Sequence, residues 1–167
     1  MATWRELYPL EAIKPLKKTI GSLFIYAIVL LFLYIFSLSW SGSSTSSSGI
    51  AGIFNWISPL WFIVIFFIIT ILTYIYQVFY MKYYFYDMQG KSLVIAKGVF
   101  SRNEITLPIN RIQDVYVDQD ILDRIFGLYD VHVSSATTAS GALSHIDGVN
   151  KGNSEKLKGL LLQAIHQ

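Results

Sequence analysis

The sequence predicts an α+β membrane protein: a two-helix transmembrane hairpin, then a small β-rich domain closed by a C-terminal helix. Two observations carry this prediction. Residues 59–80 contain no charged side chain, and as a helix rising about 1.5 Å per residue they match the roughly 30 Å hydrocarbon core of a bilayer. From Lys82 onward the chain instead turns polar and shows the apolar–polar alternation of strands.

Composition agrees with this division. The chain has 167 residues, of which 53% are hydrophobic and only 14% charged, against about 25% charged in a typical soluble protein. The absence of cysteine excludes a disulfide framework, a thiolate metal site and a cysteine nucleophile. A net charge of +2 is too small to indicate a nucleic-acid partner.

The chain begins with a polar segment, residues 1–19, which we expect to be cytoplasmic, with Trp4 and Tyr8 at the membrane interface. The apolar run Ile20–Trp40 follows and is long enough to span a bilayer. A charged start before an apolar run also occurs in signal peptides, but no small-residue cleavage site follows this one. We therefore predict a first transmembrane helix over residues 20–40.

A serine-rich outer loop, residues 41–58, separates the two helices, and tryptophans at its ends fit an aromatic belt. Its second part, Ile50–Ser58, is either a short interfacial helix or an irregular lead-in, and the residues favour neither. Pro59 suits the first turn of the second helix, which we expect over residues 59–80.

Charges predict the orientation of this hairpin. Lys14, Lys17 and Lys18 precede the first helix, Lys82 follows the second, and the loop between them carries no charge. The positive-inside rule then predicts a multi-pass protein of the cell (plasma) membrane with both termini in the cytoplasm.

The remaining 81–167 segment is predicted to form a small, partly open barrel or sandwich of short strands. Glycine, asparagine and serine clusters separate the alternating runs, and residues 121–128 are expected to be a loop or one helical turn closed by Gly127. The expected strands cover residues 83–88, 92–98, 104–110, 111–120, 128–136 and 143–149.

A C-terminal helix is expected to begin near residues 152–154, with Asn153 or Ser154 as its N-cap. Its apolar side chains recur at helical spacing and form one stripe, which needs a sheet face or end to cover. The stripe consists of Leu157, Leu160, Leu161, Ala164 and Ile165.

Residues 82–167 resemble the bacterial pleckstrin-homology-like (PH-like) domain of the YdbS type, found in small prokaryotic membrane proteins after one transmembrane hairpin. The most specific matching parts are the strand–turn–strand around Gly98, Leu107–Val115, and Leu122–Leu128 leading into the next strand. The resemblance implies a PH-like split β-barrel of two near-orthogonal antiparallel sheets, with the C-terminal helix closing one end.

Six residues of the matching motifs are candidates for a structural or binding role: Pro108, Arg111, Gln113, Asp114, Arg124 and Gly127. The guanidinium of Arg111 offers a bidentate fork to a phosphate or lipid headgroup. The alternative, which we favour, is an ion pair of Arg111 with Asp114, Asp123 or Asp130. Arg124 is likewise expected to be structural.

Three lysines, Lys82, Lys91 and Lys97, are candidates for contact with anionic lipid, each contributing about 1 kcal/mol close to the surface. Residues 81–167 carry nine basic and nine acidic side chains and are formally neutral. This balance argues against strong phosphoinositide binding.

No constellation of residues indicates catalysis, a metal or a cofactor. The acidic run Asp114, Asp118, Asp120 and Asp123 lacks the glycine and terminal glutamate of a calcium loop, so we expect a solvated acidic face. The domain's histidines lie in no known catalytic frame. We expect a protein that is not an enzyme.

These observations favour a membrane-anchored interaction module that binds a protein partner through an exposed strand edge. The alternative is a self-assembling membrane subunit with a lipid-headgroup-sensing or transport-associated role. The expected partners are therefore the lipid bilayer and either another protein or further copies of the chain, and no nucleic acid.

Overall fold

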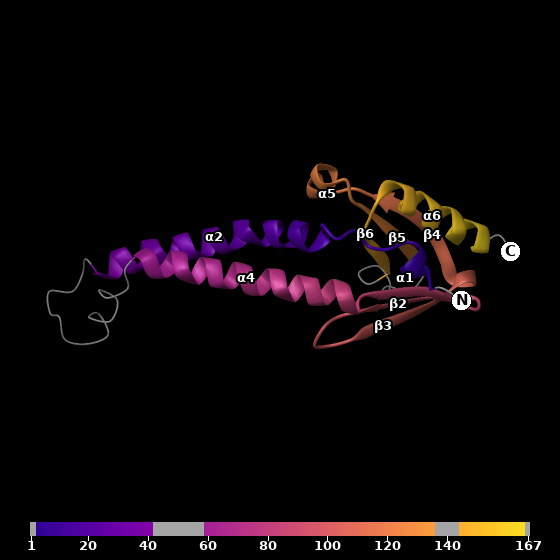
Figure 1. Cartoon of the computed structure of the whole chain (residues 1–167), viewed down its shortest axis with the longest axis horizontal. Helices are drawn as coiled ribbons and strands as arrows, with labels where there is room; N and C mark the ends of the chain where they lie inside the picture. The colour runs from indigo at the N-terminus through magenta and orange to yellow at the C-terminus, as the bar shows by residue number, and fades with distance from the viewer. Residues whose placement is uncertain (1–2, 42–58, 136–143, 166–167) are drawn as a thin grey trace. The chain divides into compact units, whose positions relative to one another are not determined.

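A computed structural model describes residues 3–41, 59–135 and 144–165 (Figure 1). The chain divides into two compact units, one of residues 18–75 and the other of residues 1–17 together with 76–167. The predictions for the outer loop, including the interfacial helix, lie outside the described residues.

The first unit is a helical hairpin made from most of α2 (Lys14–Ser41) and α4 (Pro59–Tyr83). Both contain a segment long and apolar enough to cross a membrane, Lys14–Phe36 and Trp61–Tyr83. The helices contact each other through a hydrogen bond of 3.1 Å between the Tyr26 and Thr73 hydroxyls. Both predicted helices are thus present, and α2 begins six residues before the expected start at Ile20.

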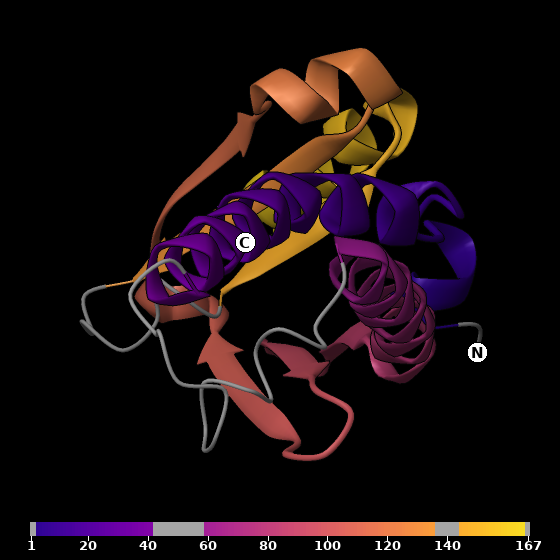
Figure 2. The same cartoon turned by 90° about the vertical axis from the view of Figure 1, so that its left-hand side faces the viewer.

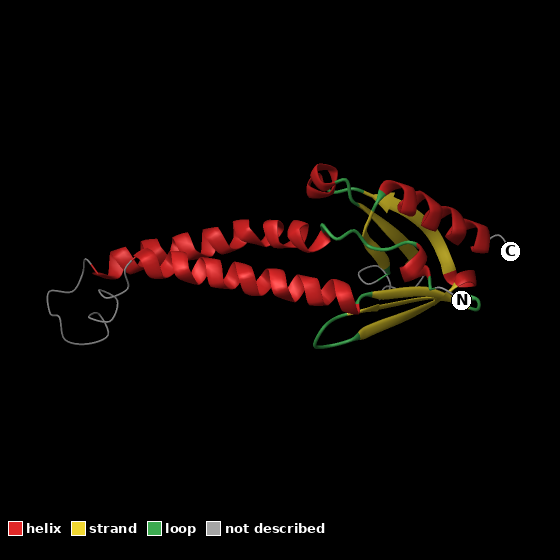
Figure 3. Cartoon of the chain, in the orientation of Figure 1, coloured by secondary structure: helices red, strands yellow, loops and turns green. Residues whose placement is uncertain are grey.

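The second unit contains two antiparallel three-stranded sheets, drawn in yellow in Figure 3. The first sheet has the order β1-β2-β3 and the second the order β4-β5-β6. Together with α6, this is the α+β arrangement that the sequence predicts. The strands are β1 (Phe85–Gln89), β2 (Ser92–Lys97), β3 (Asn103–Pro108), β4 (Ile112–Asp118), β5 (Tyr129–Ser135) and β6 (His145–Val149).

Short helices connect or flank these strands. The 3-10 turn η1 (Ile109–Arg111) joins the two sheets, and α5 (Ile121–Phe126) joins β4 to β5. Figure 2 shows α5, in orange, at the end of the two strands that it connects. Gly127 ends α5 at φ 67°, the left-handed conformation that favours glycine, as the sequence predicts.

Two turns of the first sheet need glycine. Gly90 has φ 60°, and among the described residues only glycines have positive φ, so Lys91 does not. A single positive φ at the first position of the two-residue β1–β2 turn fits the type II′ form that suits a hairpin. Gly98 opens the β2–β3 turn at φ 117°, where a Cβ atom would lie 1.9 Å from the Ser101 carbonyl oxygen. Only glycine fits there.

The core lies between the inner faces of the sheets and α6 (Lys151–Ile165). Leu157 and Leu161 of the predicted stripe are fully buried. The predicted N-cap, Asn153 or Ser154, is wrong, because the helix already begins at Lys151. Asn150 is the cap, and its Oδ1 accepts a hydrogen bond of 2.8 Å from the Asn153 N–H.

The N-terminal segment also packs on the sheets. Leu10 is 6% exposed and belongs to the core, and Trp4 and Tyr8 pack against it. The Trp4 N–H, at the start of α1 (Trp4–Leu7), donates to Asp87 Oδ1 at 3.0 Å, and the Glu11 N–H donates to the Gly148 carbonyl at 2.9 Å. Trp4 and Tyr8 therefore serve the domain core, where we expected the membrane interface.

Candidate functional site

Strand β3 is an outer strand of the first sheet, and β4 is an outer strand of the second. The turn η1 connects them. The other two outer strands are contacted by the N-terminal segment. Helix α1 lies against β1, and Glu11 bonds to Gly148 of β6. Among the described residues, α6 lies against β4, whereas β3 has no comparable neighbour besides β2, so its outer edge is available.

Hydrogen bonding defines which backbone groups of β3 face outward. The Ile109 N–H donates to the Lys91 carbonyl at 3.0 Å. Bonded pairs alternate along an antiparallel ladder, so in this register Ile105 and Leu107 bond to β2. The backbone N–H groups of Glu104 and Thr106 therefore point away from β2, and Pro108, which has no N–H, takes the next outward position.

The same reasoning applies to β4. The Val133 N–H donates to the Ser144 carbonyl at 2.9 Å, toward β6. The neighbouring residue of β5, His132, then bonds to Tyr116 of β4. This leaves the backbone groups of Val115 and Val117 on the outer side of β4.

Four of the six predicted motif residues lie where β3 and β4 are joined by η1, whereas Arg124 and Gly127 belong to α5 and its C-cap. Pro108 ends β3, and Arg111, Gln113 and Asp114 are all exposed around η1. Beside them lies a groove of about 760 Å³, the corner groove, between the β1–β2 turn, the end of β3 and the end of α6. Its lining includes Met88, Lys91, Ser92, Pro108, Asn110 and Ile165.

None of the ion pairs that we favoured for Arg111, with Asp114, Asp123 or Asp130, is present among the described residues. Asp123 pairs with Lys17, and Asp130 accepts a hydrogen bond from the Gly148 N–H at 2.7 Å. Among the described residues no ion pair involves Arg111. Arg124 is exposed on α5, so both arginines present their charge to solvent.

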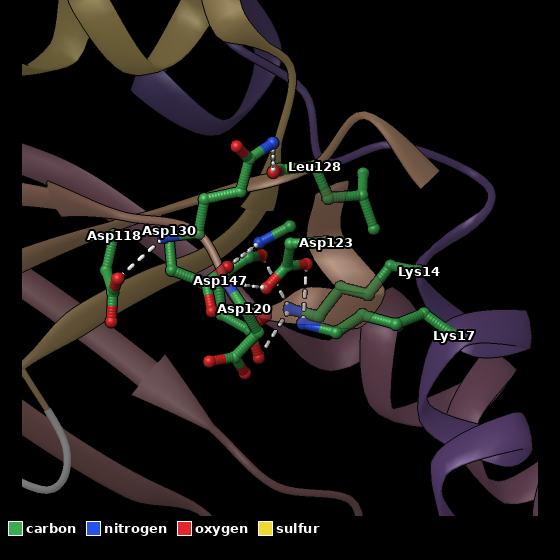
Figure 4. Close-up of polar contacts among 10 residues, drawn as sticks. Lys14, Lys17, Asp118, Asp120, Asp123, Leu128, Asp130 and Asp147 are labelled. Carbon is green, nitrogen blue, oxygen red and sulfur yellow. Dashed lines mark hydrogen bonds and ion pairs between the residues drawn. The ribbon is translucent and has the colours of Figure 1, made fainter. Parts of the chain in front are cut away.

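A buried charge cluster lies at the start of α2: Lys14, Lys17, Asp123, Asp130 and Asp147 (Figure 4). Lys14 Nζ lies 3.3 Å from Asp147 Oδ2, and Lys17 Nζ lies 2.5 Å from Asp123 Oδ1. The two lysines are 2% and 4% exposed. Charges removed from water this completely are tolerated only as pairs. The two ion pairs therefore connect the first turn of α2 to α5 and β6.

The structure corrects two predictions about charged residues in and near the cluster. Asp123 is fully buried, so the acidic run is not a solvated face at this position. Lys97 is 5% exposed and its Nζ lies 5.2 Å from the centroid of the Tyr84 ring, so it is not placed for contact with a lipid surface. Lys82 and Lys91 are exposed.

Tyr84 lies beside the cluster, and its hydroxyl donates to the His145 carbonyl at 2.6 Å. Complete burial, with the negative charge of Asp147 adding to it, holds the pKa of Tyr84 well above its usual value. Lys14 Nζ lies 4.4 Å from the centroid of this ring. Tyr84 is thus a neutral aromatic wall for the Lys14 ammonium.

Asp130 is the carboxyl group of the cluster whose pKa is raised. Burial and the neighbouring charge of Asp147 raise the pKa of Asp130 from 3.8 to about 7. Three aspartates face two lysines, so the cluster is electrically balanced when Asp130 holds a proton.

Replacing Asp130 with asparagine should therefore stabilise the protein above neutral pH. The folded state keeps a proton that the unfolded state releases above pH 3.8, so the wild type loses stability as pH rises from 3.8 to about 7. We expect Asp130→Asn to match the wild type near pH 4 and to exceed it by about 2 kcal/mol at pH 8, a value that allows for solvent screening.

Unfolding titrations at both pH values measure this difference. Asp118→Asn is the control, because Asp118 is exposed and lies opposite Asp130 in the ladder. An equal advantage of Asp130→Asn at both pH values would contradict the assignment.

The histidines form part of an aromatic row on the second sheet. The His132 ring stacks on Tyr116 at 4.9 Å and on His145 at 5.2 Å between ring centroids. Such cross-strand stacking stabilises neighbouring strands. Among the described residues, no group of three or more histidine, cysteine or acidic side chains is placed to hold a metal ion.

The sequence contained weak signals of the buried charge cluster. Asp130 and Asp147 each follow a core or partly buried apolar residue in a strand, and Asp123 sits within the apolar stretch of α5. What the sequence lacks is any local mark that pairs them with lysines more than 100 residues earlier.

Comparison with known proteins identifies a family. A family model described as the bacterial PH domain matches residues 13–165, which include the helical hairpin and both lysines of the buried charge cluster. No curated protein and no solved structure matches the chain. The family confirms the resemblance read from the motifs, whereas its YdbS-type subdivision stays a prediction. The chain belongs to the bacterial PH domain family.

Proposed function

We propose that this protein is a membrane-anchored PH-like interaction module, without enzymatic activity, that binds a protein partner through β3 and the corner groove. The observation that carries the proposal is the outward-facing edge of β3, beside a groove able to accept side chains. A partner strand would bond to Glu104 and Thr106 and place side chains in the groove, which is the mode of β-augmentation.

The edge suits selective rather than indiscriminate pairing. It is short, it ends at Pro108, and Glu104 lies 3.7 Å from Arg102 at its other end. Proline and charged side chains at a sheet edge oppose non-specific strand association. A partner therefore needs complementary charge as well as a free strand.

The anchoring proposal is supported by which parts of the chain form the sheet-containing unit. Residues 3–17 and 76–165 pack together although α2 and α4 separate them in the chain. If these helices cross the plasma membrane, both ends of the chain must lie on one side of it. The exposed Lys18 and Lys82 lie near the ends of the apolar segments on that side, which supports a cytoplasmic location.

The proposal of a non-enzymatic role is supported by how the buried ionisable groups are used. Lys14, Lys17, Asp123 and Asp147 form ion pairs with one another. A catalytic acid or base must reach its substrate, and these pairs lie buried within the fold.

The test uses photo-crosslinking in the intact membrane, from a photoreactive amino acid in place of exposed Gln113. We expect one discrete adduct with another protein. Thr106→Pro removes an outward N–H while leaving the β2–β3 bonds intact, and it should weaken the adduct about fivefold, since a lost hydrogen bond costs about 1 kcal/mol.

Thr106→Val is the matched control, because it keeps the backbone N–H and should leave the adduct unchanged. An adduct with the mass of two copies of the chain would favour the self-assembling subunit instead. The absence of any adduct, or equal loss with Thr106→Val, would contradict binding through the strand edge.

A further inference from the structure

Phe100 is 92% exposed, more than any other large hydrophobic side chain of the described residues. It stands in the β2–β3 turn, Gly98–Arg102, which joins two strands of the first sheet. Removing a phenylalanine side chain from water is favourable. The fold leaves this gain unused within the described residues.

The turn places Phe100 beside α4. The conformation of Gly98, which no side chain fits, closes the turn tightly. The Phe100 ring lies nearly parallel to that of Tyr76 of α4, with ring centroids 6.1 Å apart and planes 15° from parallel. Phe100 therefore lies next to the last turns of α4 with nearly all of its surface still exposed.

These last turns belong to both the sheet-containing unit and the membrane candidate. Residues 76–83 are grouped with the sheets, and they also end the apolar segment Trp61–Tyr83. Tyr76 precedes Lys82, the first charge after the apolar run, by six residues, which is about 9 Å along a helix axis.

This distance determines the depth of Phe100. The headgroup layer on each side of a bilayer is only about 5–8 Å thick. Where α4 crosses the membrane with Lys82 at the headgroups, Tyr76 reaches the hydrocarbon boundary, and the ring stacked on it reaches the same depth.

A groove of about 330 Å³ runs between the turn and the end of α4. Tyr76, Tyr80, Val99 and Phe100 line it, together with the polar side chains of Ser101 and Asn103. The side chain of Arg102, two residues after Phe100, is 68% exposed, and its Nη2 lies 3.7 Å from Glu104 Oε2. Apolar side chains with an exposed cationic side chain nearby match the chemistry of an anionic phospholipid, whose acyl chain and phosphate need both.

We propose that the β2–β3 turn is a third membrane element, in which Phe100 inserts into the leaflet that α4 enters and a lipid acyl chain occupies the groove. This proposal rests on the membrane anchoring proposed above. It adds a lipid contact made by the domain itself, and it fixes which end of the first sheet faces the bilayer.

Spin-label depth measurements test this insertion. The chain contains no cysteine, so each introduced cysteine carries the only label. The full chain is reconstituted into vesicles of phosphatidylethanolamine and phosphatidylglycerol. The accessibility of each label to oxygen, which concentrates in lipid, is then compared with its accessibility to a water-soluble nickel chelate.

Three positions calibrate the result. Phe67→Cys, within the apolar segment of α4, should give the deepest label, and Glu155→Cys, exposed on α6, should give an aqueous one. We expect Phe100→Cys to lie between them, with an oxygen-to-nickel ratio several-fold above that of Glu155→Cys. Val99→Cys keeps Phe100 intact and should report a similar depth, which Phe100→Ser should reduce.

The outcomes separate the two proposals. Aqueous labels at both Val99→Cys and Phe100→Cys, with a deep label at Phe67→Cys, would overturn the insertion of the turn and leave the anchor intact. An aqueous label at Phe67→Cys would overturn the anchor, and the insertion of the turn with it.

Discussion

Asp123→Ala should destabilise the folded domain by about 3–5 kcal/mol, because it leaves a buried ammonium without its carboxylate. Lys17 is 4% exposed and its Nζ lies 2.5 Å from Asp123. The carboxylate also accepts the Asp120 N–H at 3.3 Å, at the start of α5. The free energy of unfolding in mild detergent, followed by near-UV circular dichroism, measures the loss.

Two further variants identify the cause. Replacing the pair with apolar residues, Lys17→Met together with Asp123→Leu, should recover most of the lost stability, because buried pairs are often replaced at little cost. Asp114→Ala removes an exposed carboxylate and should change stability by less than about 0.5 kcal/mol. If Asp123→Ala cost no more than Asp114→Ala, the pair would not hold the domain together.

Leu161→Ala should cost about 2–5 kcal/mol, the range for truncating a fully buried leucine. Leu161 is 0% exposed in α6, which packs on β4 and β5. The change removes apolar contacts and leaves a cavity between the helix and the second sheet. The same unfolding measurement applies.

The adjacent residue provides the control. Leu162 is 36% exposed, so Leu162→Ala should cost well under half as much. Equal costs for the two changes would mean that α6 presents a different face to the sheets from the one described.

Much of the domain could be predicted because the alternation of apolar and polar residues, a local feature of the sequence, indicates its strands. Ile105 and Leu107 face the core while Glu104 and Thr106 are exposed, as their alternation indicates. The helical spacing of Leu157 and Leu161 likewise predicts the buried stripe of α6. The ends of elements were harder, as the cap of α6 at Asn150 illustrates, because several neighbouring residues have capping side chains.

The buried charge cluster could not be predicted in the same way. Proximity to an apolar run assigned Lys14 and Lys17 to the membrane surface, and that reasoning uses no tertiary information. Their carboxylate partners lie more than 100 residues away in sequence. Likewise, Lys97 alternates into the core at the end of β2, where only the packing against Tyr84 reveals its surroundings.

The division of one folded unit across the hairpin has a consequence for biogenesis. Leu10, Lys14 and Lys17 leave the ribosome long before β6 and α5, which complete their surroundings. The domain can therefore reach its final fold only after the second helix has been synthesised. A fragment that starts at Lys82 would expose the core surface that Leu10 covers and would leave Asp123 and Asp147 without their lysine partners. A water-soluble version of the domain must therefore connect residues 3–17 to residue 76 through a flexible linker.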